Sequence, residues 1–122
     1  MKQITNEEIK EKLATLPALI ARAAQEAEDA RVVYEKQKMK LKNQERELIL
    51  QEKKNNPKIA VTQLKEVIPT KLQAEYEALL DIESIYEKKR IEVTALDNSF
   101  TGYKRIAQIK LVEMQSGISY EK

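Results

Sequence analysis

A heptad row of apolar residues in the C-terminal half constrains this chain more than any other feature. The row recurs at every seventh position, at Leu72, Leu79, Tyr86, Val93, Phe100, Ala107 and Met114. This period places side chains on one face of an α-helix and is typical of coiled-coil packing. Thr70 and Gln73 form a T-x-x-Q capping box, so the pattern predicts a helix over about 70–115. Gly102 costs about 1 kcal/mol inside such a helix, and we expect a kink or a close contact near it.

The N-terminal half carries a second long helical pattern. One row is Ile20, Ala27, Tyr34, Leu41 and Leu48, and its companion is Leu16, Ala23, Ala30, Gln37, Gln44 and Gln51. The pattern predicts a helix over about 17–54 whose packing face turns polar in its second half. Ahead of it, Thr5 and Glu8 form a T-x-x-E capping box, which predicts a short helix over about 6–15. Pro17 disfavours helical backbone at the residue before it, so the short helix is expected to end there.

A break at Asn55-Asn56-Pro57 separates the two long patterns. Asn tolerates left-handed backbone and Pro cannot continue a helix. A short helix over about 63–68 is predicted after it, with Thr62 as its N-cap and an end before Pro69. The expected fold is all-α: a single domain, 1–122, in which a short N-terminal helix precedes a long antiparallel, coiled-coil-like helical hairpin. Each long helix offers more apolar face than one partner covers, so we expect a homo-oligomer.

The composition argues against an enzyme. Cys and His are absent and only two Gly are present. The chain therefore lacks thiolates, the commonest general base and metal ligand, and any glycine-rich phosphate loop. Glu83 and Glu87 share a helix face and could hold a hard metal, but a solvated face is the favoured interpretation. We predict no catalytic residue, no metal and no cofactor. Without a long apolar run or an apolar leader, we expect no membrane association and a cytoplasmic location, the host cytoplasm if a phage encodes the chain.

The charges are segregated along the chain, although the net charge is only +2. Residues 30–65 contain ten Lys and Arg against four Glu, whereas residues 66–97 contain four basic and eight acidic residues. A basic field of this kind favours binding to the phosphates of a nucleic acid. The candidate contacts, called the basic arm below, are Lys36, Lys38, Lys40, Lys42, Arg46, Lys53, Lys54 and Lys58.

A second cluster mixes cations with aromatic residues, as proteins that bind single strands do. It contains Lys104 and Arg105 beside Phe100 and Tyr103. Phe100 also belongs to the heptad row, and a packing role for its ring is the favoured interpretation. Lys104 and Arg105 remain candidate contacts for nucleic acid.

The overall pattern resembles small phage proteins of the recombination-mediator (UvsY-like) group. The resemblance rests on Leu41-Lys42 in the long helix, the segment Val61–Lys65, and two short motifs, Ala95-Leu96-Asp97 and Tyr103-Lys104-Arg105-Ile106. It implies an oligomeric helical protein without a catalytic site that binds single-stranded DNA and helps a recombinase to displace the single-strand-binding protein. The chain departs from the basic L-K-A-R-type motif of the family, because Asn43 and Gln44 stand where the family has Ala-Arg.

Two other readings stay open. The chain can be a non-enzymatic helical oligomer acting as a structural, scaffold or interaction module, in which acidic residues 66–97 pair with the basic arm within or between subunits. It can also be a small inhibitor that binds one host protein through an exposed helix face. The sequence favours an accessory protein of phage recombination or replication that binds single-stranded DNA and helps to load a recombinase.

Overall fold

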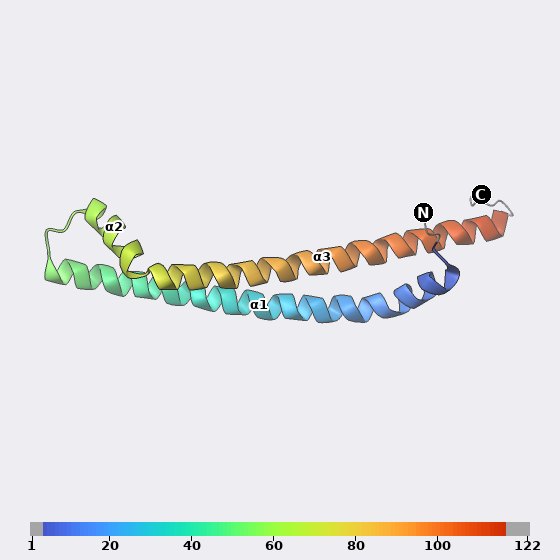
Figure 1. The fold of residues 1–122 in the computed structure, drawn as a ribbon, viewed down its shortest axis with the longest axis horizontal. Helices are drawn as coiled ribbons and strands as arrows, with labels where there is room; N and C mark the ends of the chain where they lie inside the picture. Colours follow the sequence, from blue (N-terminus) through green and yellow to red (C-terminus); the bar gives the residue numbers. More distant parts are fainter. Residues whose placement is uncertain (1–3, 117–122) are drawn as a thin grey trace. The chain divides into compact units, whose positions relative to one another are not determined.

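The computed structural model describes residues 4–116, and these residues are helical without any strand. The helices are α1 (Asn6–Asn55), α2 (Val61–Lys71) and α3 (Gln73–Ser116) (Figure 1). The predicted all-α class is therefore confirmed. The chain divides into two compact units, the described parts of 1–27 with 89–122 (unit 1), and 28–88 (unit 2). The single domain over 1–122 stays a prediction.

Helix α1 begins at the predicted cap. The backbone N–H of Glu8 donates to the Thr5 Oγ1 at 3.1 Å, which satisfies one of the unpaired donors of the first turn. Ile9 in that turn is buried. Glu7 and Glu8 also place negative charge at the positive end of the helix dipole.

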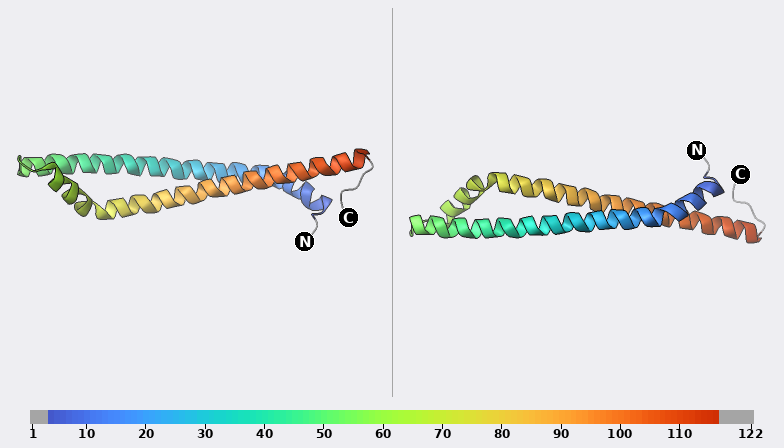
Figure 2. Two further views of the ribbon diagram at one scale, coloured as in Figure 1. Left: turned by 90° about the horizontal axis from the view of Figure 1, so that it is seen from above. Right: turned by 90° about the horizontal axis from the view of Figure 1, so that it is seen from below.

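The predicted short N-terminal helix is wrong, because α1 continues through Pro17 without ending. Pro17 lies on an exposed side of α1, where water can replace the hydrogen bond that its ring denies to the carbonyl of Leu13. The blue end of α1 bends in Figures 1 and 2, which is the usual response of a helix to an internal proline.

In unit 1, the N-terminal part of α1 packs against the C-terminal part of α3. The buried side chains Leu16 and Ala23 belong to the companion row that the sequence predicted as a packing face. Two polar contacts join the helices: the Lys89 Nζ donates to the Glu26 Oε2 at 3.1 Å, and the Lys110 Nζ donates to the Ile4 carbonyl at 3.5 Å. Glu26 contacts Lys89, whereas Ile4, earlier in the chain, contacts Lys110, later in the chain. The two segments are therefore antiparallel.

The connection in unit 2 differs from the prediction. As predicted, α1 ends at the Asn55-Asn56 break, where the Asn56 side chain accepts a hydrogen bond from the N–H of Lys58. Helix α2 is longer than predicted and includes Pro69, and its N-cap is Ala60, whose N–H donates to the Gln63 Oε1 at 3.3 Å.

The expected caps at Thr62 and Thr70 are therefore wrong. The Gln63 side chain accepts the hydrogen bond of the Ala60 N–H at the start of α2. The break expected before Pro69 lies instead at Leu72, the residue between α2 and α3. The Thr70 hydroxyl donates instead to the carbonyl of Glu66. The two views of Figure 2 show α2 turning away from the end of α1 and back toward α3.

Unit 2 has a thin apolar core between α1 and α3. Leu41 is 5% exposed. The rings of Tyr34 and Tyr86 stack across the pair, with centroids 5.9 Å apart. Gln37 and Gln44 line a groove beside Leu41 and Leu79, so the predicted polar section of the packing face leaves the helices incompletely packed.

Tyr76 and Glu45 form a polar contact across the same helix pair. The Tyr76 hydroxyl donates to the Glu45 Oε1 at 2.6 Å. Desolvation of the ring, followed by this hydrogen bond, raises the pKa of Tyr76 to about 12. A raised tyrosine pKa means that the folded state favours the neutral phenol, so the contact contributes stability below pH 10 and loses it as the pH rises toward 12.

We expect Tyr76→Phe to lower the stability by about 1 kcal/mol at pH 8, the usual worth of one such hydrogen bond. The deficit should shrink between pH 10 and pH 12, since the tyrosine ionises in the unfolded chain from about pH 10 whereas the folded chain holds its proton up to about pH 12. Thermal melts followed by circular dichroism from pH 8 to pH 12 measure the difference. A deficit that stays constant through pH 12 would show that the hydroxyl contributes nothing through this contact.

Candidate nucleic-acid interface

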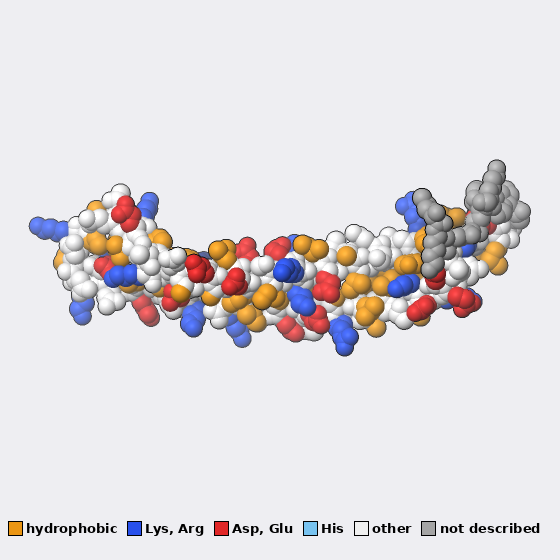
Figure 3. All heavy atoms as spheres, in the orientation of Figure 1, with side chains coloured by type: hydrophobic (Ala, Val, Ile, Leu, Met, Phe, Trp, Pro, Cys, Tyr) orange, Lys and Arg blue, Asp and Glu red, His pale blue; other side chains and the backbone are white. Residues whose placement is uncertain are grey.

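The basic arm lies on the C-terminal half of α1 and on the connection to α2, wholly inside unit 2. Every one of its eight side chains is exposed. Blue side chains project around the end of α1 and around α2 on the face drawn in Figure 3. Lys104 and Arg105 are exposed as well, but they belong to α3 in unit 1 and are not part of this surface.

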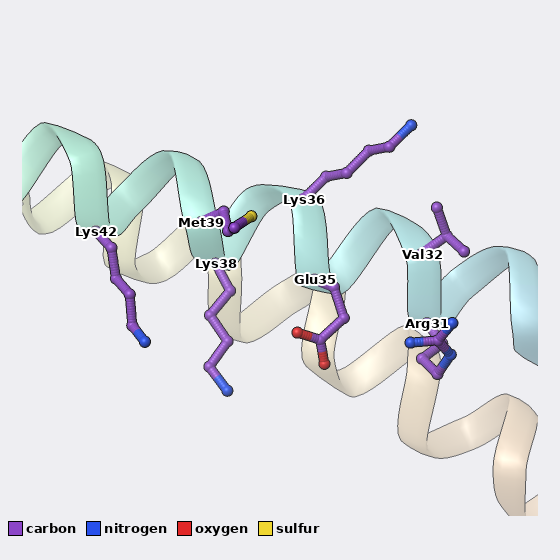
Figure 4. A pocket seen from close by; sticks show the side chains of 7 residues that line it. All are labelled: Arg31, Val32, Glu35, Lys36, Lys38, Met39 and Lys42. Carbon is purple, nitrogen blue, oxygen red and sulfur yellow. The ribbon is translucent and has the colours of Figure 1, made fainter.

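Part of the arm surrounds a shallow hollow on one side of α1. It is lined by Arg31, Val32, Glu35, Lys36, Lys38, Met39 and Lys42. All seven residues come from α1, at positions that fall on two neighbouring ridges of the helix. In Figure 4, Lys38 and Lys42 extend to the same side as Arg31 and Glu35, whereas Lys36 and Val32 extend to the other side. The hollow therefore has cations on both edges.

The floor of the hollow is apolar. The Met39 side chain is 70% exposed, and Val32 is exposed about two helical turns earlier on the same face. The sequence interpretation missed Val32, Met39 and Arg31. The signal for Val32 and Met39 was the spacing 32, 36, 39, which places both on one helix face with Lys36, and the signal for Arg31 was the spacing 31, 35, 38, 42, which places it on the neighbouring ridge.

Three carboxylates of unit 2 have partners outside the basic arm. Glu28 makes a two-pronged contact with Arg31, at 2.6 and 2.9 Å, Glu52 pairs with Lys71, and Glu45 accepts from Tyr76. The Arg31 hydrogen bond lowers the pKa of the Glu28 carboxyl below its usual value. Glu28 therefore remains ionised and neutralises Arg31, so the remaining charges that line the hollow are those of Lys36, Lys38 and Lys42 against the single carboxylate of Glu35.

Among residues 4–116, no side chain of the basic arm forms an ion pair. The predicted pairing of the arm with acidic residues 66–97 is therefore not formed inside the described part of the chain. An aromatic contact of the arm is formed by Lys38, whose Nζ lies 5.5 Å from the centroid of the Tyr34 ring. Pairing between subunits stays a prediction.

The second cluster behaves differently. Phe100 is only partly exposed, and the Lys104 Nζ lies 4.7 Å from the centre of its ring. This cation–π contact holds Lys104 along α3. Arg105 extends from an exposed position on the same helix.

Residues 4–116 contain no group of three or more carboxylates that could hold a metal ion. Glu83 and Glu87 thus lack a third ligand among the described residues. No helix in this part of the chain combines the length and apolarity that crossing a membrane requires.

The surface on α1 carries exposed lysines beside exposed apolar side chains, and none of these lysines forms an ion pair with the part of the chain that the structure describes. Such a surface binds anionic polymers through their charge and can also contact an apolar or aromatic group of the same ligand. Comparisons with protein-family models, with curated proteins and with solved structures gave no match.

Proposed function

We propose that this protein binds single-stranded DNA through the basic arm and serves phage recombination or replication as an accessory protein that helps to load a recombinase. The observation that carries the proposal is the exposure of all eight arm cations without an ion pair among residues 4–116. Cations without a carboxylate partner can neutralise phosphates. The counterions that the phosphates then release supply most of the non-specific affinity for a nucleic acid.

The apolar floor of the hollow supports a single strand as the ligand. Val32 and Met39 lie between the cations of α1 and offer an apolar contact to an unstacked base. Bases of a duplex are stacked inside the helix and cannot make this contact from the backbone side. The proposal therefore predicts tighter binding to a single strand than to a duplex of equal length.

The part played by a recombinase or a single-strand-binding protein rests on the resemblance to recombination mediators. In this role the protein needs no catalytic residue, metal or cofactor of its own, and it acts in the cytoplasm of the host. It also acts as a homo-oligomer of helical hairpins, so that several basic arms engage one strand.

A titration of a fluorescent single-stranded oligonucleotide tests the proposal, with a duplex of the same length for comparison. For six phosphate contacts on a single strand, the affinity should fall by about 300-fold between 50 and 200 mM salt. Binding that is equal for both forms would remove the single-strand preference. Absence of binding at 50 mM salt would overturn the proposal.

A helical oligomer with a structural or protein-interaction role is the second candidate. It is favoured by the many large apolar side chains that the described chain leaves exposed, among them Leu80, Ile85 and Ile91. The two candidates differ in one respect, because a purely structural oligomer would show salt-sensitive assembly and no affinity for DNA.

A further inference from the structure

A row of exposed side chains runs along α1 in unit 2, on the side turned away from α3. Tyr34, Leu41 and Glu45 lie on the opposite side of α1, where they pack against α3 or bond to it. The positions of the row alternate by four and three residues, which keeps them on one helix face. The members of this outer row, all of them exposed, are Val32, Lys36, Met39, Asn43, Arg46, Leu50 and Lys53.

The outer row contains no carboxylate, although acidic residues are common on this part of α1. Those between residues 28 and 55 are Glu28, Asp29, Glu35, Glu45, Glu47 and Glu52. Glu28 and Asp29 stand just before the row begins, and Glu35 and Glu47 lie on its two flanks. The cations of the row form no ion pair with the described residues. A polyanion that follows the row therefore meets cations along its path and carboxylates only beside it.

Large apolar side chains stand between these cations. Met39 is 70% exposed and Leu50 is 64% exposed. Val32 and Met39 belong to the hollow described above, and Val32 extends to the same side of α1 as Lys36 in Figure 4. Leu50 lies about three helical turns beyond Met39, outside the hollow. The mixed character of the row thus continues well past the hollow toward the end of α1.

The alternation favours a single strand over a lipid surface as the occupant. A helix that lies in a membrane interface needs a continuous apolar face that can sink below the headgroups. The apolar side chains of the outer row are two and three turns apart, with Arg46 between Met39 and Leu50. A single strand, in contrast, presents phosphates and base faces in turn along its whole length.

From this pattern we infer that a single strand lies lengthwise along the outer row of α1 and that Leu50 contacts a base at the far end of the interface. Phosphates lie against Lys36, Arg46 and Lys53, and the Asn43 side chain offers a donor and an acceptor to a base edge. The row is ~32 Å long at ~1.5 Å per residue. A stacked strand advances about 3.4 Å per nucleotide, so the contact covers about nine nucleotides at most. The inference rests on the proposed function and extends its interface beyond the hollow.

Leu50→Ser tests the far end of the interface without changing the charge of the chain. It should weaken binding of a single-stranded oligonucleotide by about fivefold at 0.1 M salt, roughly the worth of one buried methylene group. Leu80→Ser is the matched control, because Leu80 is 63% exposed on α3 of unit 2 and the helix-propensity cost is the same. It should bind as the wild type does. Circular dichroism checks that both variants keep their helices.

An abasic strand of equal length identifies the group that Leu50 contacts. It keeps the phosphates and lacks the bases, so the wild type and Leu50→Ser should bind it equally. If the wild type binds the intact strand and Leu50→Ser binds it just as tightly, the inference is overturned and the proposed function stands. Equal losses on the intact and abasic strands, or an equal loss in Leu80→Ser, would also overturn it. Absence of wild-type binding at 50 mM salt would overturn both proposals.

Vesicles of phosphatidylglycerol provide the lipid comparison. The chain should not bind them at 0.1 M salt, because the apolar members of the outer row are too far apart to enter the bilayer together. Vesicle binding that Leu50→Ser abolishes, combined with unchanged binding of DNA by that variant, would assign the outer row to a lipid surface and overturn the inference.

Discussion

Replacing Lys38, Lys40 and Lys42 together by Glu should lower the affinity for single-stranded DNA by at least about 100-fold at 0.1 M salt. Each phosphate contact on a single strand contributes about 0.7 to the slope of log affinity against log salt, so three lost contacts amount to about two orders of magnitude. The slope itself should fall by about two. Because phosphates carry no sequence information, the loss should be uniform across oligonucleotides of different sequence. Fluorescence anisotropy over a range of salt concentrations measures both quantities.

A matched triple replacement separates this local effect from net charge. Lys10, Lys12 and Arg22 are exposed cations of α1 in unit 1, and their replacement by Glu changes the net charge by the same amount. This variant should bind far more tightly than the triple variant of the arm, with a slope close to that of the wild type. If the two triple variants lost affinity equally, the arm would be only one part of a diffuse electrostatic field.

The largest effect on stability should come from Leu41→Ala, at about 2–3 kcal/mol. Leu41 is 5% exposed and lies with Leu79 beside the groove between α1 and α3, where Gln37 and Gln44 supply little apolar contact. Few neighbouring side chains can move into the space, so the cavity persists. Loss of this size should lower the melting temperature by about 10 °C, as followed by circular dichroism.

Leu50→Ala is the control for helix propensity and general hydrophobicity. Leu50 is on the same helix but 64% exposed. Its replacement should change the stability by no more than about 0.5 kcal/mol. Equal losses at the two positions would show that unit 2 does not depend on the packing of Leu41.

The helical class and the packing faces could be predicted because heptad spacing carries them directly. The rows that contain Leu16, Ala23, Leu41 and Leu72 contribute buried side chains. Thr5 could be recognised as a cap because it stands at the correct distance from Glu8. Local signals of this kind depend only on neighbours within one turn of the helix.

The helix ends near proline could not be predicted by the same rules. Pro17 and Pro69 were expected to end helices, and both lie inside them. The local cost of proline is offset by the packing of the turns on both sides, which a rule based on neighbouring residues does not include. Likewise, Thr70 and Gln73 match a capping box, yet the Gln73 side chain donates to Glu77 instead.

The candidate interface was predictable in composition but not in geometry. The sequence identified the cations of the basic arm, since a local excess of Lys is visible by counting. It could not show that Val32 and Met39 provide an apolar floor between them, nor that Glu45 and Glu52 would be occupied by Tyr76 and Lys71. Those facts depend on contacts between residues far apart in the chain.

The most direct test of the account is a fluorescent reporter in the hollow of α1. The chain has no cysteine, so Met39→Cys can carry a single environment-sensitive dye between Lys36, Lys38 and Lys42. Adding single-stranded DNA should change its emission in a saturable way that added salt reverses, whereas the same dye on Leu19→Cys in unit 1 should not respond. Binding of DNA that leaves the dye at residue 39 unchanged, or that alters only the dye at residue 19, would contradict the assignment of the interface.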